Sequence, residues 1–326
     1  MWEKVCISYA TGQKDNGVKD FFMKQLQLIG GDASAEAMKV YLGSKEICEP
    51  ALAVIVAVGG KTAETIMAES LKNKDLPCAA AVMNALAIMK SRSAINEYIT
   101  WASGIDLNIK ASAYFALAQS GSPLAYPVLS NAAKDVSYIW ERTGATASLL
   151  IYAKIIGQNG DIKTMDKICK LIISKCDDNS NIQNKTAALE IYVSFHGINA
   201  MPDLLKAASN TNDKYRSAAM RISLGIPGSE VVSKWITYFP KAIPAAKPEI
   251  ITMLGIRGDE MALPLITSSL TDKDINVRKA AAEALVTISG SQSVNYLVNY
   301  LLVFSSAPDQ EAAKSALMTV WGRDRM

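Results

Sequence analysis

The stretch MALPLITSSLTDKDINVRKAAAEALVTISG, residues 261–290, determines the expected fold of this chain. In its first half, leucines and isoleucines recur at helical spacing until the polar residues 271–274. In its second half, valine, alanine, leucine and isoleucine line one face and end at Gly290, a residue that commonly terminates helices. The stretch therefore predicts two short amphipathic helices joined by a tight turn.

The same pattern recurs upstream in residues 199–228, NAMPDLLKAASNTNDKYRSAAMRISLGIPG. Weaker copies of the second helix occur at residues 76–89, 106–121 and 182–197. One constant offset aligns six landmarks of the two best units, namely Pro202 with Pro264, Leu204 with Ile266, Asn212 with Asp274, Arg216 with Arg278, Ala219 with Ala281, and Gly228 with Gly290.

Helix-ending residues recur along the whole chain with a mean period of roughly 32 residues, within the range of helical solenoids. The predicted helix ends fall near Gly30, Gly60, Lys90, Gly121, Gly157, Gly197, Gly228, Gly258, Gly290 and Gly322. Longer steps predict insertions around residues 136–140 and 177–182. We therefore expect an all-α, right-handed α-α superhelix of about ten helix pairs, in which residues 1–326 form a single array and stacking buries a continuous core.

The composition agrees with packed helices and gives no strong sign of a polyanionic partner. Half of the residues are hydrophobic but only 7% are aromatic, and the formal net charge is +3. A basic excess this small disfavours nucleic acid as a partner.

The longest apolar run, residues 51–60, is about half the length needed to span a bilayer. With no signal-peptide pattern, the predicted location is cytoplasmic, or periplasmic or secreted if Met1 is not the native start.

The pattern ALPLIxxxLxDxDxxVRxAAAxAL, residues 262–285, resembles HEAT repeats and HEAT-like repeats of the phycobilin-lyase type, which form armadillo-like solenoids. The resemblance implies that Pro202 and Pro264 kink the first helices. It also implies a polar ladder between neighbouring repeats, formed by Asp274 with Arg278 and by Asp213 with Arg216. Asp274 and Arg278 are four residues apart, so a local ion pair on one helix is a further expectation.

The resemblance leaves several functions open, because similar arrays mostly bind proteins while others are pigment lyases, alkylated-base DNA glycosylases or iron-dependent hydroxylases. A hydroxylase needs repeated His-Glu pairs, and the chain has one histidine, His196, which we expect to cap a helix end or lie on the surface. Gly60, Lys61 and Thr62 match the end of a phosphate loop, but Ile55 stands where its first glycine is required. The five cysteines form no CxxC pair and are expected to be buried free thiols. We therefore predict no catalytic residue, cofactor or metal, and a chain that is not an enzyme.

Two sets of residues are candidates for a partner surface. If the repeat alignment holds, Glu283 points into the concave groove, and its equivalents are Asn84, Phe115, Glu190 and Arg221. Their mixed polarity favours a protein or peptide partner, with a merely solvated face as the alternative. The densest aromatic cluster, Trp235, Tyr238 and Phe239, is either a second contact patch or part of the core.

The expected function is a non-catalytic scaffold that binds a protein or peptide along its concave face. The alternative is a nucleic-acid-processing enzyme similar to the HEAT-like glycosylases, which would show clustered Lys and Arg around an exposed Trp and a carboxylate. The sequence ends shortly after Gly322, whereas a solenoid needs a polar cap on its last unit. This predicts either further domains of a larger protein or a partner docked at that end.

Overall fold

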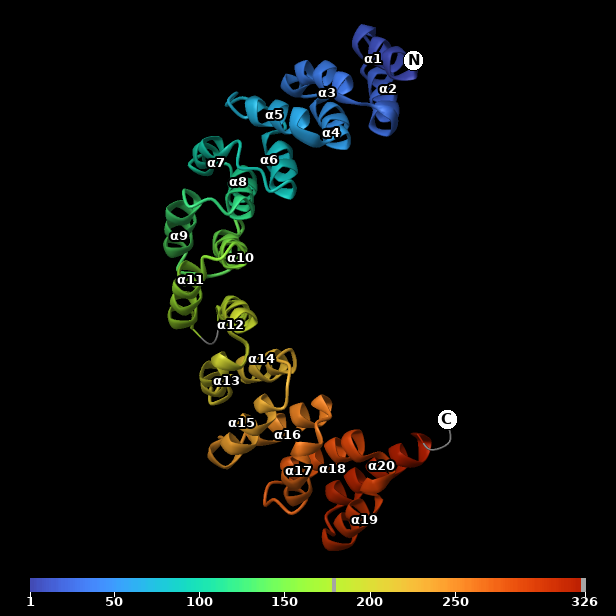
Figure 1. Cartoon of the computed structure of the whole chain (residues 1–326), viewed down its shortest axis with the longest axis vertical. Coiled ribbons are helices and arrows are strands. Elements are labelled where there is room, and N and C mark those ends of the chain that lie inside the picture. The colour runs from blue at the N-terminus through green and yellow to red at the C-terminus, as the bar shows by residue number, and fades with distance from the viewer. Residues whose placement is uncertain (178–179, 324–326) are drawn as a thin grey trace. The chain divides into compact units, whose positions relative to one another are not determined.

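The computed structural model describes residues 1–177 and 180–323, and every regular element in this part of the chain is a helix (Figure 1). The chain divides into two compact units, Met1–Cys176 and Asp177–Met326. The boundary between the units falls where the spacing of helix-ending residues predicts the second insertion. Each unit is described by itself below.

The first unit contains helices α1 to α11. Their bounds, with that of the 3-10 helix η1, are α1 (Trp2–Gly12), α2 (Asn16–Ile29), α3 (Asp32–Met38), η1 (Lys39–Gly43), α4 (Cys48–Val58), α5 (Gly60–Ser70), α6 (Ala79–Ile88), α7 (Ile95–Ala102), α8 (Leu107–Ser120), α9 (Ala125–Asp135), α10 (Ala145–Gln158) and α11 (Ile162–Lys175).

The second unit contains helices α12 to α20 and four 3-10 helices. Their bounds are α12 (Ile182–His196), η2 (Gly197–Ala200), α13 (Met201–Ala208), α14 (Asp213–Leu224), α15 (Glu230–Tyr238), η3 (Phe239–Lys241), α16 (Ala246–Arg257), η4 (Glu260–Ala262), α17 (Leu263–Ser269), α18 (Ile275–Ser289), η5 (Gly290–Ser293), α19 (Val294–Val303) and α20 (Ala307–Arg323). The described residues thus hold twenty α-helices in sequence, which confirms the prediction of about ten pairs.

Within each unit the helices form two rows (Figure 1). Each even-numbered helix contacts the next one, as α6 does α8, α8 does α10, and α16 does α18. The odd-numbered helices cover the other side, and the even-numbered row lies on the inner side of the bend of each unit. Because the apolar stripes of both rows face each other, the core is a continuous layer between the rows. All five cysteines lie in this core as free thiols, as expected.

Short polar residues and glycines set the helix ends. Gly121 and Gly258 adopt the left-handed conformation that closes α8 and α16. Other predicted ends are only approximate: α14 ends at Leu224, before Gly228, α4 ends at Val58, before Gly60, and Gly157 and Gly322 lie inside α10 and α20. Side-chain oxygens accept hydrogen bonds from first-turn amides at the N-caps Asp15, Asp106, Asp161, Asn212 and Asp274.

The two prolines of the best repeats lie at the junction of a 3-10 helix and an α-helix. Pro202 follows η2 in the first turn of α13, and Pro264 follows η4 in the first turn of α17. Proline is tolerated there because its missing N–H would have no intrahelical partner. The expected kink of these first helices stays a prediction.

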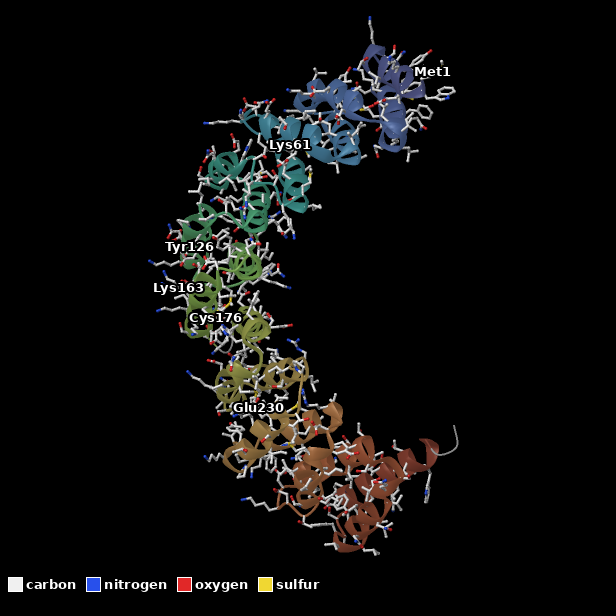
Figure 2. All side chains as sticks on the ribbon, viewed as in Figure 1. Met1, Lys61, Tyr126, Lys163, Cys176 and Glu230 are labelled. Atoms are coloured by element: carbon white, nitrogen blue, oxygen red, sulfur yellow. The ribbon has the colours of Figure 1, made fainter. Side chains whose placement is uncertain are left out.

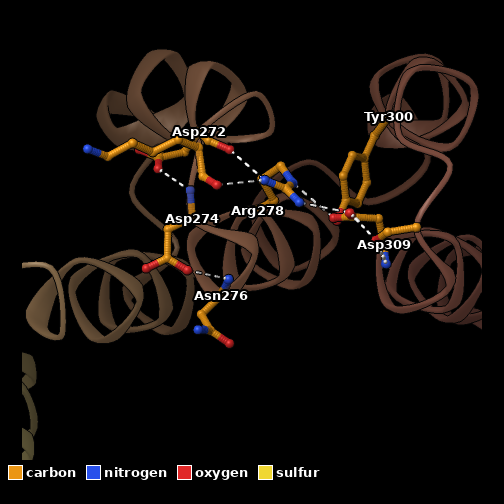
Figure 3. A network of polar contacts seen from close by, with 8 residues as sticks. Asp272, Asp274, Asn276, Arg278, Tyr300 and Asp309 are labelled. Atoms are coloured by element: carbon orange, nitrogen blue, oxygen red, sulfur yellow. Dashed lines mark hydrogen bonds and ion pairs between the residues drawn. The ribbon is translucent and has the colours of Figure 1, made fainter.

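Buried arginines connect neighbouring repeats of the second unit. Arg278 of α18 donates from Nε and Nη2 to the carboxylate of Asp309 of α20, at 2.9 and 2.8 Å (Figure 3). Arg216 of α14 contacts Glu249 of α16 in the same way, at 3.3 and 3.0 Å. A ladder between repeats is present, and both arginines belong to it.

The acidic partners predicted for this ladder are wrong. Asp274 caps α18 by accepting from the Asn276 amide at 2.9 Å, and Arg278 instead donates to main-chain carbonyl oxygens of the preceding turn. Asp213 accepts from the amide of Lys214. An acid at the start of a helix is held by free amides there, so the arginine reaches across to the next repeat.

Candidate functional site

The five residues predicted for the concave face all lie on even-numbered helices. Glu190, Arg221 and Glu283 are exposed on α12, α14 and α18 of the second unit. Asn84 is exposed on α6 of the first unit, and Phe115 is half-buried on α8. The repeat alignment thus selected one row of helices, although contact with a partner stays a prediction.

An ion pair joins two of these residues across neighbouring helices. Arg221 Nη2 lies 2.9 Å from Glu190 Oε2, and the two side chains remain 56% and 52% exposed. The hydrogen bonds that Arg221 donates to the Glu190 carboxylate raise the pKa of Arg221. An ion pair this exposed adds little stability. Its effect is to place opposite charges side by side, so this part of the row has no single sign.

A groove lies between α14 and α16 beside Arg221. Its volume is about 470 Å³, and exposed Leu224 and Ile256 line it together with buried Met220 and Met253. Ile256 is 63% exposed. The remaining lining residues are Ser217, Arg221, Pro248, Glu249 and Thr252.

A second hollow, of about 700 Å³, begins where the α14–α16 groove ends. Leu224 and Ile256 border both, and the loop residues 225–229 form much of the second one. Arg257 is fixed there by donating to the carbonyl oxygens of Ser223 and Gly228, at 3.2 and 2.5 Å. Leu224 and Ile256 therefore lie between two hollows. The arginines at the edges of these hollows, Arg221 and Arg257, already have hydrogen-bond partners within the chain.

The aromatic cluster is not a surface patch. Trp235 is fully buried and Phe239 is nearly so, while Tyr238 is half-buried. The Tyr238 hydroxyl lies 2.6 Å from the hydroxyl of Ser209, which directly follows α13. The contact-patch interpretation is wrong for Trp235 and Phe239, because α15 turns its apolar stripe inward and these rings fill the core.

The described residues offer little for chemistry. No group of three or more His, Cys, Asp or Glu side chains in this part of the chain could hold a metal ion. Gly60 and Lys61 begin α5, and Figure 2 labels Lys61 there. Lys61 forms an ion pair with Glu64 at 2.9 Å. His196 ends α12 and packs against the ring of Tyr192, with centroids 4.4 Å apart. The helix-stop interpretation of residues 60–62 is wrong, because α4 ends at Val58 and these three residues begin α5. The helix-end position of His196 is confirmed.

Sequence reasoning missed the apolar part of the groove. The alignment followed one position per repeat, and in α14 that position is Arg221, whereas Leu224 lies one turn further along the same face. Ile256 and Met253 belong to α16, whose residues matched the repeat pattern too weakly to be aligned. The cue available was the high apolar content of residues 250–256, where Thr252 is the one polar side chain, because this exceeds what one buried stripe needs.

Comparison with known proteins supports the architecture. Residues 235–318 match the family of HEAT repeats. Kap121p bound to Pho4p and Kap121p bound to Ste12p superpose with TM-scores of 0.52 and 0.51, each at 12% identity over 98% of this chain and 45% of Kap121p. Human deoxyhypusine hydroxylase in complex with glycerol gives a TM-score of 0.33 at 16% identity, over 89% of this chain and 97% of the enzyme. No curated protein sequence gives a significant match.

These identities show the fold alone. The chain spans less than half the length of Kap121p. None of the helices in the described residues is long and apolar enough to cross a membrane.

Proposed function

We propose that this chain, an all-helical solenoid that contains HEAT repeats, is a non-catalytic scaffold that binds a protein or peptide along its even-numbered helices. The α14–α16 groove is the single observation that carries the proposal. Apolar lining with a few polar groups at the edge is the usual make-up of a site that holds a side chain of a partner. In this proposal the two units form one continuous array, and further domains of the same polypeptide are compatible with it.

The charges around the groove support a protein partner over a polyanion. Arg221 is paired with Glu190, and Arg216 is paired with Glu249. Neutralised pairs cannot release counterions from a phosphate backbone as free cations do. The structures of Kap121p with Pho4p and with Ste12p offer a precedent for a solenoid of this fold with a bound protein, by analogy alone.

The glycosylase alternative has less support. A damaged base would need an exposed aromatic ring beside a carboxylate and several cations. Among the described residues of the α14–α16 groove there is no tryptophan. Trp101 is half-buried and donates from its indole nitrogen to the Leu71 carbonyl oxygen at 3.0 Å.

The test compares two surface variants of the full chain. Ile256→Asp places a charge in the groove, and Leu302→Asp, on the exposed face of α19, is the matched control. Native extract is passed over immobilised wild type and both variants, retained proteins are identified by mass spectrometry, and the affinity of a purified partner is then measured by calorimetry. We expect Ile256→Asp to weaken binding by at least about tenfold, because central apolar anchors dominate interface energies.

Two results contradict the proposal. One is a partner that binds both variants as well as wild type. The other is retention of nucleic acid that weakens steeply as salt rises, which favours the glycosylase alternative.

A further inference from the structure

Two of the five cysteines occupy equivalent places in neighbouring repeats of the first unit. Cys48 is the first residue of α4, and Cys78 directly precedes the first residue of α6. These helices are consecutive members of the even-numbered row and contact each other (Figure 1). Because equivalent positions of stacked repeats lie side by side, the stacking brings both cysteines to the same end of one interface between repeats.

The two thiols meet beside the 3-10 helix η1. The Cys78 thiol donates to the Leu42 carbonyl oxygen of η1 at 3.7 Å. A short turn leads from η1 to α4, where the Cys48 amide donates to the Ser44 carbonyl oxygen at 2.9 Å. Burial raises the pKa of the Cys78 thiol to about 12, and a hydrogen bond with the Cys48 thiol adds to this rise. Both cysteines are free, and two thiols that share a hydrogen bond need only a small movement to reach bonding distance.

Burial protects this pair from most reagents but leaves a route for a small oxidant. Cys48 and Cys78 are 3% and 4% exposed. The high pKa keeps the Cys78 thiol protonated at neutral pH, and a protonated thiol is a poor nucleophile. A hollow of about 380 Å³ adjoins the pair, because it is lined by Leu42, whose carbonyl oxygen accepts from Cys78, and by Leu76. A molecule as small and neutral as hydrogen peroxide can enter that hollow.

Cys169 of α11 shows what distinguishes the pair from an ordinary buried cysteine. Cys169 is fully buried, and burial raises its pKa to about 12 as well. Its thiol lies 3.7 Å from the sulfur of Met165. A thioether cannot form a disulfide, whereas the sulfur beside Cys78 belongs to a second thiol. The surroundings of Cys78 and Cys169 are therefore alike except for the chemistry of the neighbouring sulfur.

We propose that Cys48 and Cys78 are a redox-sensitive pair, which a small peroxide converts into a disulfide between two repeats. In the first step one thiol takes an oxygen atom from the peroxide and becomes a sulfenic acid, while the other peroxide oxygen leaves as water. In the second step the remaining thiol attacks the sulfenic sulfur, the S–S bond forms, and the hydroxyl leaves as water with the thiol proton. Two thiols and one hydrogen peroxide thus give one disulfide and two waters.

The disulfide would join the repeat of α3 and α4 to that of α5 and α6. It closes a segment of chain that contains all of α5, and such a closure restricts opened states more than the folded state. The oxidised chain therefore holds α4 and α6 together more firmly than the reduced chain does. The pair lies in the first unit and does not depend on the α14–α16 groove.

A metal site fits this pair less well than a disulfide. A structural zinc site needs four ligands, most often cysteines and histidines. Within residues 1–177 and 180–323, no group of three or more His, Cys, Asp or Glu side chains could hold a metal ion.

The test exposes the reduced full chain to hydrogen peroxide and then maps its cysteines. Remaining thiols are blocked with N-ethylmaleimide in denaturant, the chain is digested without reductant, and the peptides are identified by mass spectrometry. We expect a peptide pair joined through Cys48 and Cys78 to accumulate within single chains and to be released by dithiothreitol. Hydrogen exchange of the α4 and α6 amides should slow by at least about tenfold on oxidation.

Three variants assign these effects to the pair. Cys78→Ser places a favoured N-cap residue before α6 and should fold, and Cys48→Ala removes the other thiol. Both are expected to lose the joined peptides and the slower exchange. The matched control is Cys169→Ser, which removes an equally buried thiol and should keep both effects.

Several results overturn the proposal. One is that Cys48 and Cys78 stay reduced, or become sulfinic acids, while no joined peptides form. Another is that either cysteine is joined mainly to a different cysteine or to another chain. A disulfide that leaves the exchange of α4 and α6 unchanged, or slower exchange that persists in Cys78→Ser, also contradicts the proposed link between these repeats.

Discussion

The buried pair between Arg278 and Asp309 allows a quantitative prediction about how the repeats are held together. The Arg278 side chain is 9% exposed and that of Asp309 is 1% exposed. Asp309 also accepts from the Tyr300 hydroxyl at 2.6 Å, and the Arg278 guanidinium lies 4.3 Å from the Phe304 ring centroid. Asp309→Ala leaves the guanidinium buried beside a lost carboxylate, which is expected to destabilise α18 and α20 by about 3–5 kcal/mol.

The matched comparison is Glu249→Ala in the repeat upstream. Glu249 makes the same kind of pair with Arg216, but its side chain is 24% exposed. Water can therefore replace part of the lost interaction, and we expect a cost of about 1–3 kcal/mol. The double variant Arg278→Met with Asp309→Leu removes both charges and should be more stable than Asp309→Ala, because the dominant penalty is the unpaired buried charge.

Hydrogen exchange of the α18 and α20 amides is the suitable assay, because a repeat array need not unfold in one step. The free energy of opening is read from the protection of these amides in each variant. The reasoning is refuted if Asp309→Ala loses no more protection than Glu249→Ala, or if the double variant is as unstable as Asp309→Ala.

Three further predictions concern other contacts between repeats. Hydrogen bonds from Lys61, Ser91 and Ser93 lower the pKa of Glu64 from 4.5 to about 2. The contribution of the Glu64 carboxylate to stability is therefore complete above pH 4.5 and is lost as the pH falls toward 2. We expect Glu64→Gln to reduce the fall in melting temperature over this acidic range. Gly255→Ala would place its Cβ 2.5 Å from that of Ala284 and should destabilise the α16–α18 contact by about 1–3 kcal/mol, whereas Gly322→Ala, which meets no atom, should be neutral or stabilising in the same urea titration. Trp235→Ala should lower stability by about 3–5 kcal/mol in that titration, and a loss below about 1 kcal/mol would contradict its place in the core.

Local features of the fold were predictable because each repeat encodes its own turn and helix ends. The polar turn before Asp274 and the glycine at 290 act on residues close to them in the chain, so spacing alone located both helices. The partner of Arg278 was not predictable in this way. It lies 31 residues further along, and only the stacking of α20 on α18 brings it within reach.

For the candidate surface, the sequence predicted which row of helices carries it but not which residues of that row form a groove. One position per repeat correctly selected exposed residues of the even-numbered helices, such as Glu283 and Arg221. It could not rank them, because a periodic pattern does not reveal where two neighbouring helices leave a groove. The cluster of Trp235, Tyr238 and Phe239 shows the same limit: a dense aromatic cluster marks either a core or an interface, and the burial of Trp235 decides for the core.

The distribution of polar contacts explains why such a chain can serve as a scaffold. Several side chains bridge adjacent repeats, from Arg92 with Ser120, 28 residues apart, to Arg257 with Ser223, 34 residues apart. These contacts hold the stack together, and they lie mostly at the interfaces between neighbouring repeats. The solvent-exposed side chains of the even-numbered helices are therefore not needed to hold neighbouring repeats together. Exposed pairs such as Glu190 with Arg221 are the exception, because they join two helices of this row. The exposed apolar side chain of Ile256 is not needed for stacking, and the binding role proposed for the α14–α16 groove gives a physical reason for leaving it in water.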